Sequence, residues 1–330
     1  MLSIATNNTT QLTIKAACHF VSSLLIILLL TACAHGPQTQ QLLHDTTLRP
    51  TALINDVPFI SQQKYQCGPA ALTMMLTYRG VQTNTEQLKS QVFLPDRNGS
   101  LQIEILATTR RYQRIPYIIN PHLKALFQEV AAGNPVLVLQ NLGLQWIPQW
   151  HYAVVIGYDL DKMTTTLHSG SNAKYQTNMT TFERTWKRAG MWGLVITEPN
   201  RIPSSADPVR YIKAVESLQG QDMVNMRIRH QAYLTATQKW PAELIPRLAL
   251  GNSYYQLGDL AAAEKSFRFA TELQPDSVLA LNNLAQTLLD IKQYDDALAI
   301  IRHAASLGGP FASTVQQTKL AIEKQLNRNQ

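Results

Sequence analysis

The spacing of apolar positions changes along the chain after residue 55. Up to about residue 133 the apolar residues follow a helical period, and from 136 to 197 they form short β-branched or apolar runs between turns. Helices followed by strands are typical of an α+β domain, which we place at residues 55–199. The predicted helices are 67–78, a short one from the capping box Thr83-Asn-Thr-Glu86, 101–111 and 121–133, and the predicted strands are 136–140, 152–158, 163–167 and 192–197.

A polar stretch with two prolines, residues 200–209, predicts a linker, and residues 210–330 return to helical spacing. The pattern there repeats after 34 residues, with small residues in register that let paired helices approach closely. We expect these helices to build a core of their own and, because two full repeats are few for a solenoid, to pack against the first domain. The recurring positions are Leu250-Gly251, Tyr254, Ala263, Phe267 and Ala270, followed by Leu284-Ala285, Leu288, Ala297, Ile301 and Ala304.

This spacing resembles that of tetratricopeptide repeats. Clear repeats cover 244–277 and 278–311, and a weaker one precedes them. The resemblance implies an array of helical hairpins that binds a protein partner or substrate.

The N-terminal apolar run, residues 19–30, is too short to cross a bilayer and follows Lys15, an arrangement typical of a secretory signal. It ends in Leu30-Thr31-Ala32-Cys33, which resembles the lipobox of bacterial lipoproteins. The resemblance implies that residues 1–32 are removed and that Cys33 carries lipid, which would anchor the mature protein in a membrane. Ala34 in the next position resembles sorting to the outer membrane of Gram-negative bacteria, facing the periplasm. The alternative is an ordinary signal peptide cut elsewhere.

Charge and cysteine content narrow the functional classes. The net charge of +7 comes from 29 Lys and Arg against 22 Asp and Glu without a dense basic block, so we infer no nucleic-acid partner. Residues 33–54 are polar and rich in turn residues, which predicts a tether from the membrane.

Of three cysteines, Cys18 lies in the signal and Cys33 is the lipid acceptor, which leaves Cys67 as the free thiol. One thiol forms neither an internal disulfide nor a zinc cage, and we expect no cofactor.

Cys67 stands where the first predicted helix of the domain begins, and Gly68-Pro69 follow it. A helix start favours the thiolate, so the sequence predicts a thiol pKa below the usual value of about 8.5. The backbone N–H of Cys67 can help to hold a developing oxyanion, and Gln62 or Gln63 can supply a side-chain donor. The alternative for Cys67 is a small core residue.

A general base has to come from elsewhere in the sequence. Among eight histidines, His151 and His168 lie in the strand-rich half of the domain, and only His151 begins an apolar strand after a turn. The imidazole of His151 would project from the edge of that strand. Trp146 and Trp150 flank the approach to His151 and could wall a cleft, with packing as the alternative role of either one.

The arrangement of Gln62, Cys67-Gly-Pro-Ala-Ala71 and His151-Tyr-Ala-Val-Val-Ile-Gly-Tyr158 resembles the bacteriocin-processing peptidases that cleave double-glycine leaders, and their papain-like relatives. The resemblance implies a papain-like fold in which Cys67 is the nucleophile, His151 the general base and then acid, and Gln62 the oxyanion donor. With the lipobox and the repeats, the chain is similar to a Gram-negative group of such lipoproteins.

One position departs from these relatives, which place Asp or Asn one strand after the histidine. Here Ser169 occupies the orienting position, and Asp159 and Asn172 are near enough in sequence to substitute. We interpret the chain as a membrane-anchored cysteine peptidase acting on a peptide or protein. The alternatives are a catalytically silent binding or assembly lipoprotein and a transpeptidase or transglutaminase-type acyl transferase.

Overall fold

The structure is a computed structural model that describes residues 36–62, 65–218, 220 and 222–328. Within these residues seven strands form one sheet in the order β2-β7-β3-β4-β5-β6, with β1 paired to β4, and every pairing is antiparallel. The α+β class predicted from the sequence is confirmed. The elements are α2 (Pro37–Leu42), β1 (Thr51–Leu53), α3 (Cys67–Tyr78), α4 (Thr85–Val92), the 3-10 helix η1 (Pro95–Arg97), α5 (Gln102–Arg111), β2 (Ile115–Ile118), α6 (Leu123–Ala131), β3 (Val136–Asn141), β4 (Trp150–Asp159), β5 (Thr164–Ser169), β6 (Asn172–Asn178), α7 (Met179–Lys187) and β7 (Gly193–Thr197).

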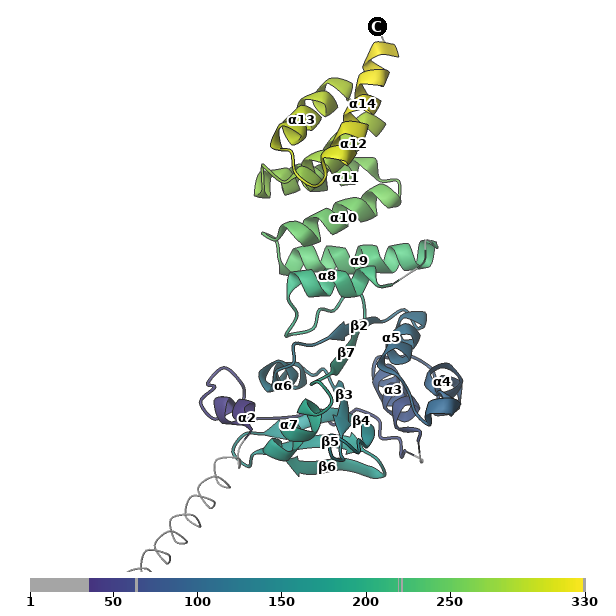
Figure 1. Cartoon of the computed structure of the whole chain (residues 1–330), viewed down its shortest axis with the longest axis vertical. Coiled ribbons are helices and arrows are strands. Elements are labelled where there is room, and N and C mark those ends of the chain that lie inside the picture. The colour runs from purple at the N-terminus through teal and green to yellow at the C-terminus, as the bar shows by residue number, and fades with distance from the viewer. Residues whose placement is uncertain (1–35, 63–64, 219, 221, 329–330) are drawn as a thin grey trace, which may run out of the picture.

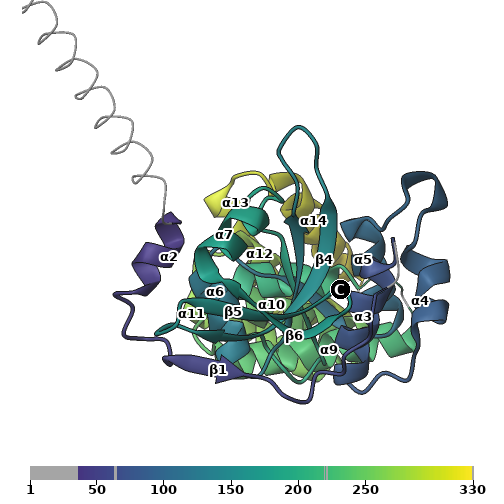
Figure 2. The same ribbon diagram turned by 90° about the horizontal axis from the view of Figure 1, so that it is seen from below.

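Helix α3 is the central helix of the domain and packs against β4. It is apolar around its whole circumference, and Leu72, Met74, Met75 and Leu76 are fully buried, which is typical of a helix enclosed on all sides. In Figures 1 and 2, α3, α4 and α5 lie to one side of the strands, and α2, α6 and α7 lie to the other. The first residue of α3 is therefore held at the junction between helices and sheet.

Helix α4 begins one residue later than the capping box predicted. Its N-cap is Asn84, whose Oδ1 accepts the backbone N–H of Gln87 at 3.0 Å. The Thr83 hydroxyl instead donates to the Gln87 side-chain oxygen at 3.3 Å. The assignment of Thr83 as the cap is wrong because asparagine, one position closer, caps at least as well.

The segment predicted to be a tether, 33–54, is packed onto the domain from residue 36 onward. Leu42 is buried in the core, and β1 pairs with β4. The buried Glu183 carboxylate of α7 accepts the backbone N–H of Gln38 at 3.1 Å and that of Thr39 at 2.8 Å, together with the Thr39 hydroxyl at 2.6 Å. The tether interpretation is wrong for these residues, because apolar positions scattered in a polar stretch supply core contacts that composition conceals.

The C-terminal part is a stack of helical hairpins (Figure 1). Helices α10 and α12 begin 34 residues apart, and so do α11 and α13, which gives the repeat expected from the sequence. A Cβ at Gly251 would overlap with the Phe267 ring, so the small residue is required for the approach of α10 to α11. The helices are α8 (Pro208–Glu216), α9 (Met223–Lys239), α10 (Leu244–Gln256), α11 (Leu260–Leu273), α12 (Val278–Asp290), α13 (Tyr294–Leu307) and α14 (Ala312–Arg328).

The helical array has two kinds of interior. Tyr211, Ile212 and Val215 of α8 belong to the same apolar cluster as the sheet, which confirms the expected packing against the first domain. A separate cluster contains buried residues of α11 to α14, including Phe267 and Ile301. Ala249 and Leu250 of α10 also belong to the first cluster, so the core that the sequence predicted for the repeats alone has its buried members only from α11 onward.

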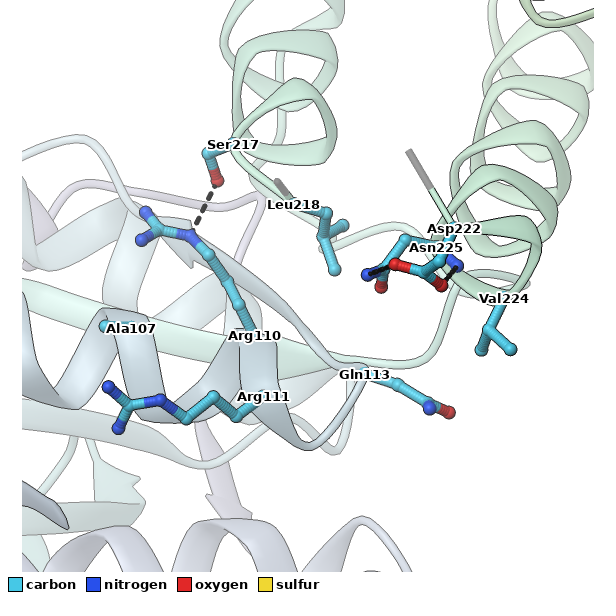
Figure 3. A pocket seen from close by; sticks show the side chains of 9 residues that line it. All are labelled: Ala107, Arg110, Arg111, Gln113, Ser217, Leu218, Asp222, Val224 and Asn225. Atoms are coloured by element: carbon cyan, nitrogen blue, oxygen red, sulfur yellow. Dashed lines mark hydrogen bonds between the residues drawn. The ribbon is translucent and has the colours of Figure 1, made fainter. Parts of the chain in front are cut away.

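Figure 3 shows a cavity where the α+β domain meets the helical array, with side chains from α5 facing others from the end of α8 and the start of α9. It has a volume of about 510 Å³, and the Arg110 Nε donates across the joint to the Ser217 hydroxyl at 3.0 Å. Arg111, Asp222 and Asn225 also line it.

Of the helices in the described part of the chain, none is both long and apolar enough to cross a membrane.

Candidate active site

The predicted nucleophile lines a cavity of about 790 Å³. Cys67 is the first residue of α3 and is partly buried. Gln62 and His151 line the same cavity, from the segment before α3 and from β4. The fold thus brings together three side chains that lie up to 89 residues apart in sequence. Cys33 and Gln63, also named from the sequence, lie outside the described residues.

Gln62 is fixed by three hydrogen bonds. Its Nε2 donates to the Tyr152 carbonyl at 3.2 Å, and its Oε1 accepts the backbone N–H of Gly170 at 3.1 Å. Its own backbone N–H donates to the Gly170 carbonyl at 3.0 Å. Gly170 has a φ of +60°, a value that a residue without Cβ adopts freely at this turn. Since an amide nitrogen carries two protons, one Nε2 proton of Gln62 is left for a ligand.

His151 is oriented by the residue that the sequence placed beside it. The His151 Nε2 and the Ser169 hydroxyl are 2.9 Å apart, and Ser169 ends the neighbouring strand β5. Because Nε2 is engaged with Ser169, Nδ1 is the ring nitrogen that remains for a thiol. Burial lowers the pKa of His151, so the ring stays neutral at pH values where an exposed histidine begins to protonate.

The pKa of the Cys67 thiol is shifted in the direction opposite to the predicted one. Burial raises its pKa, and the backbone N–H groups of Tyr152, Gly68 and Cys67 itself offset only part of this effect. The expectation of a lowered pKa is wrong because removal of water outweighs the helix start. Among the described residues no hydrogen bond joins the Cys67 sulfur to the His151 ring. Both pKa shifts favour a neutral thiol and a neutral imidazole in the resting site.

His168 has a different role from His151. It is 2% exposed, its Nε2 contacts the Val57 carbonyl at 3.2 Å, and its Nδ1 accepts the backbone N–H of Lys174 at 3.1 Å. Both ring nitrogens are used, and the Phe59 ring lies 5.2 Å away, centroid to centroid. His168 therefore packs β5 against the segment before α3 and takes no part in the cavity.

Neither substitute for Ser169 reaches His151. Asp159 lies at the opposite end of β4, eight residues on, which corresponds to about 26 Å along a strand. Its carboxylate pairs with Lys162 at 3.1 Å. Asn172 pairs with Ser169 across β5 and β6, but it is exposed. Ser169 is the side chain that orients the imidazole.

Sequence reasoning did not identify Tyr152 and Ser100 as residues of the site. Tyr152 contacts Cys67 through its backbone N–H and Gln62 through its carbonyl, and its hydroxyl donates to the Ser100 carbonyl at 3.3 Å. A Cβ at Gly68 would overlap with the Ser100 side chain, so the glycine lets the loop from η1 to α5 close over the start of α3. The signal available was Gly68 itself, although a glycine does not say what approaches it.

Of the two predicted cleft tryptophans, Trp150 lines the cavity and Trp146 does not line it. Among the described residues no group of three or more His, Cys, Asp or Glu side chains is arranged to hold a metal. The arrangement presents a thiol, a base and two N–H donors to one space. That set suits nucleophilic attack on a carbonyl carbon.

Comparison with known proteins identifies the two parts of the chain. Residues 54–193 match the model of the Peptidase_C39 like family, and residues 248–310 match a tetratricopeptide-repeat model. The chain thus carries a C39-like peptidase domain followed by tetratricopeptide repeats, which are modules of protein–protein interaction. No curated protein sequence matches the chain significantly.

Similar solved structures cover the two parts separately. A putative C39-like peptidase from Bacillus anthracis is 18% identical, with 46% of this chain and 98% of that chain covered and a TM-score of 0.39. A double-glycine motif protease from an AMS/PCAT transporter, solved with its leader peptide, is 20% identical, with coverage of 44% and 93% and a TM-score of 0.34. The TPR2B domain of yeast Sti1, solved as a complex with pHsp70, is 17% identical, with coverage of 36% and 94% and a TM-score of 0.32.

Proposed function

We propose that the protein is a cysteine peptidase whose nucleophile is Cys67. The observation that carries this proposal is the meeting of Cys67, His151 and Gln62 in one cavity, with Ser169 2.9 Å from the far nitrogen of the imidazole. Three features support these roles: the thiol lies at a helix start, one nitrogen of the base is oriented, and two hydrogen bonds hold the side-chain amide of Gln62 while a third fixes its backbone.

In the acylation step the His151 Nδ1 takes the thiol proton while the sulfur attacks the carbonyl carbon of a peptide bond. The resulting oxyanion accepts hydrogen bonds from the backbone N–H of Cys67 and from the free Nε2 proton of Gln62. His151 then gives its proton to the leaving amine, the C–N bond breaks, and a thioester remains on Cys67. Water, deprotonated by His151, attacks the thioester and releases the acid and the thiol.

If the thiol and the imidazole are both neutral at rest, His151 acts as a general base that removes the thiol proton. Because the pKa of Cys67 is raised and that of His151 is lowered, the proton moves during attack and not before it. Ser169 supplies a hydrogen-bonding oxygen but no charge to stabilise the imidazolium, so catalysis is slower than with a carboxylate in that position.

The proposal includes the cellular setting. Lipidation of Cys33, suggested by Leu30-Thr31-Ala32-Cys33, would hold the enzyme at the periplasmic face of the outer membrane. The repeats would bind a protein partner or the protein substrate. An intact-mass measurement of the membrane-extracted protein tests the first point, with Cys33→Ser as the variant that should lose the acyl chains.

The second candidate function is that of a catalytically silent binding protein. It is favoured by Ser169 in place of an acid and by the raised pKa of the thiol. Acyl transfer to an amine is a variant of the first mechanism, since a thioester reacts with either water or an amine.

The test is cleavage of a peptide library by the purified protein, followed by mass spectrometry, together with labelling by an epoxide probe. Cys67→Ala and His151→Ala should each lose about a thousandfold or more in cleavage, and Gln62→Ala about a hundredfold. Asn172→Ala, exposed beside Ser169, is the matched control and should retain activity. Labelling of Cys67 without cleavage of any peptide would favour the silent protein, and amine-linked products would favour acyl transfer.

A further inference from the structure

The loop between β3 and β4 carries an unusual concentration of exposed apolar side chains. Trp146 is 76% exposed, Ile147 63%, Trp150 56%, Leu144 52% and Leu142 49%. No charged residue occurs from 141 to 150. Figure 2 shows this hairpin projecting from the body of the domain. Exposed apolar patches of this kind mark an interaction surface.

The hairpin is held in a defined shape. The Asn141 side chain accepts the backbone N–H of Gly143 at 3.0 Å and that of Gln149 at 2.9 Å, and it donates to the Leu144 carbonyl at 3.3 Å. A Cβ at Gly143 would overlap with the Ile147 carbonyl, so the tip is tightly folded. The apolar side chains are therefore presented by a rigid turn, which loses little entropy when it binds.

The tip is separate from the catalytic cavity. Trp150, at the base of the hairpin, lines the cavity with Cys67 and His151, whereas Trp146 and Ile147 do not line it. A substrate residue held at Cys67 thus leaves the most exposed pair of the hairpin uncovered. The occupant of the tip is something other than the scissile residue.

Helix α7 connects the hairpin to the start of the described chain. Arg188, the C-cap of α7, donates to the Asn141 carbonyl through Nε at 3.1 Å and through Nη2 at 3.0 Å. Glu183, five residues earlier, binds Gln38 and Thr39. Five residues span about 7.5 Å of helix, so the two attachments lie close together. In Figure 2, α7 lies between α2 and the hairpin.

The distance to the proposed anchor is also short. Cys33 precedes Gly36 by three residues, and three residues span at most about 11 Å. Gly36 in turn abuts Glu183, since a Cβ there would overlap with its carboxylate. A lipid on Cys33 would therefore place α7, and with it the base of the hairpin, next to the membrane surface.

The charge of this face favours a lipid surface. Arg184, Lys187 and Arg188 occupy the last turn of α7 and its cap, and all three are exposed. Basic side chains attract anionic headgroups by about 1 kcal/mol each near the surface. Tryptophan is enriched at the boundary between headgroups and acyl chains, and Leu and Ile suit the layer beneath it.

We propose that the Leu142–Trp150 hairpin is a membrane-inserting wedge that seats the domain on the bilayer beside the acyl anchor, with the basic end of α7 on the headgroups. The proposal rests on the proposed lipidation of Cys33 for its setting. The wedge would fix the orientation of the cavity mouth relative to the membrane.

The test separates the wedge from the anchor. The mature chain from residue 33, carrying Cys33→Ser, is floated with vesicles of phosphatidylethanolamine containing a quarter phosphatidylglycerol. The double variant Trp146→Ala/Ile147→Ala should bind these vesicles at least tenfold more weakly. The matched control Phe311→Ala/Leu320→Ala removes two exposed apolar side chains from the far end of the array and should bind like the parent.

Other results overturn the wedge. Equal flotation of the double variant and its parent, or no flotation of the parent, would exclude insertion of the hairpin. Loss of peptide cleavage without vesicles would assign the tip to a peptide, and loss of a dimer in sedimentation would assign it to a second copy. Because the assayed chain carries no acyl group, failure of lipidation at Cys33 leaves all of these outcomes unchanged, and it is measured separately by intact mass.

Discussion

The Glu129 carboxylate and the catalytic cavity both place polar groups inside the α+β domain. They differ in whether any hydrogen-bonding group remains without a protein partner and can bind a ligand. Glu129 accepts the Asn134 amide at 2.7 Å and the backbone N–H groups of Ser204 at 3.0 Å and Ser205 at 2.6 Å. Asn134 in turn accepts the buried Arg79 at 2.6 Å. All of these partners are protein groups, and they tie the linker after β7 to the domain.

The cavity keeps part of its hydrogen-bonding capacity for a substrate. One Nε2 proton of Gln62 and the His151 Nδ1 have no assigned partner in the described contacts, while Ser169 holds the other side of the imidazole. The Cys67 sulfur meets only backbone N–H groups among the described residues, so its proton stays available. Saturated polar groups fix the relation between segments, and unsaturated groups held in place are ready to react. We therefore expect changes at Glu129 to affect folding and changes at the cavity to affect chemistry.

The largest effect should come from removing the linker that Glu129 binds, together with the helices that follow it. A chain ending at Glu198 loses Tyr211, Ile212 and Val215 from the domain core. At about 2 kcal/mol each, their loss costs on the order of 6 kcal/mol, comparable with the whole stability of a domain. We expect this chain to be insoluble or to melt without a cooperative transition in circular dichroism.

The matched truncation ends at Glu243, just before α10, and keeps α8 and α9. It should fold cooperatively and retain epoxide labelling of Cys67, although it loses Ala249 and Leu250 from the edge of the shared core and the repeats that form the separate cluster. A stable, reactive chain ending at Glu198 would contradict the shared core and would make the linker a true domain boundary.

Glu129→Gln should have the next largest effect. An amide offers one acceptor oxygen where the carboxylate offers two, so two of the donors to Glu129 lose their partner inside the protein. We expect a loss of about 3 kcal/mol in the free energy of unfolding, measured by denaturant titration. Glu243→Gln, an exposed position, is the control and should change stability little. An equal loss in both variants would remove the distinction drawn between the two polar sites.

The same contrast explains which parts of the fold could be predicted from the sequence. Several buried elements with regular spacing were predicted, including α3 and β4, whereas α7 was missed although Met179, Phe182 and Trp186 bury one of its faces. β2 was missed because Pro116 interrupts its pattern, which is tolerated at the edge of the sheet. β6 was missed because its residues are almost all exposed and polar. Edge strands are defined by their neighbours more than by their own side chains.

The site was predictable where local sequence decides the chemistry. Cys67 at a helix start and His151 at a strand start stand in recognisable patterns. The direction of the pKa of Cys67 was not predictable, because burial depends on the approach of the Ser100 loop and Tyr152 from elsewhere in the chain. The same holds for the choice of Ser169 over Asp159, which only the length and direction of β4 settle.

Ser169→Asp should increase cleavage. A carboxylate at the position of the serine hydroxyl, 2.9 Å from Nε2, would stabilise the imidazolium and raise the pKa of His151. Each unit of pKa corresponds to about 1.4 kcal/mol, or tenfold, and we expect a gain of about tenfold in kcat/KM. Ser169→Ala, which removes the hydrogen bond without adding charge, should lower it. A gain in Ser169→Ala as well would mean that the hydroxyl does not orient the ring.

The smallest effect concerns pH, and it asks whether the cavity rests as a neutral pair. The lowered pKa of His151 keeps its ring basic below the ordinary value of about 6.5, so the acid limb of kcat/KM should lie below that pH. The raised pKa of Cys67 puts the midpoint of its alkylation by iodoacetamide above about 8.5. Ser169→Asp should move that midpoint down, because it favours the thiolate–imidazolium pair, whereas Glu129→Gln should leave it unchanged. An alkylation midpoint near pH 5 in the parent would show that an ion pair already exists, and the general-base role of His151 would then be limited to deacylation.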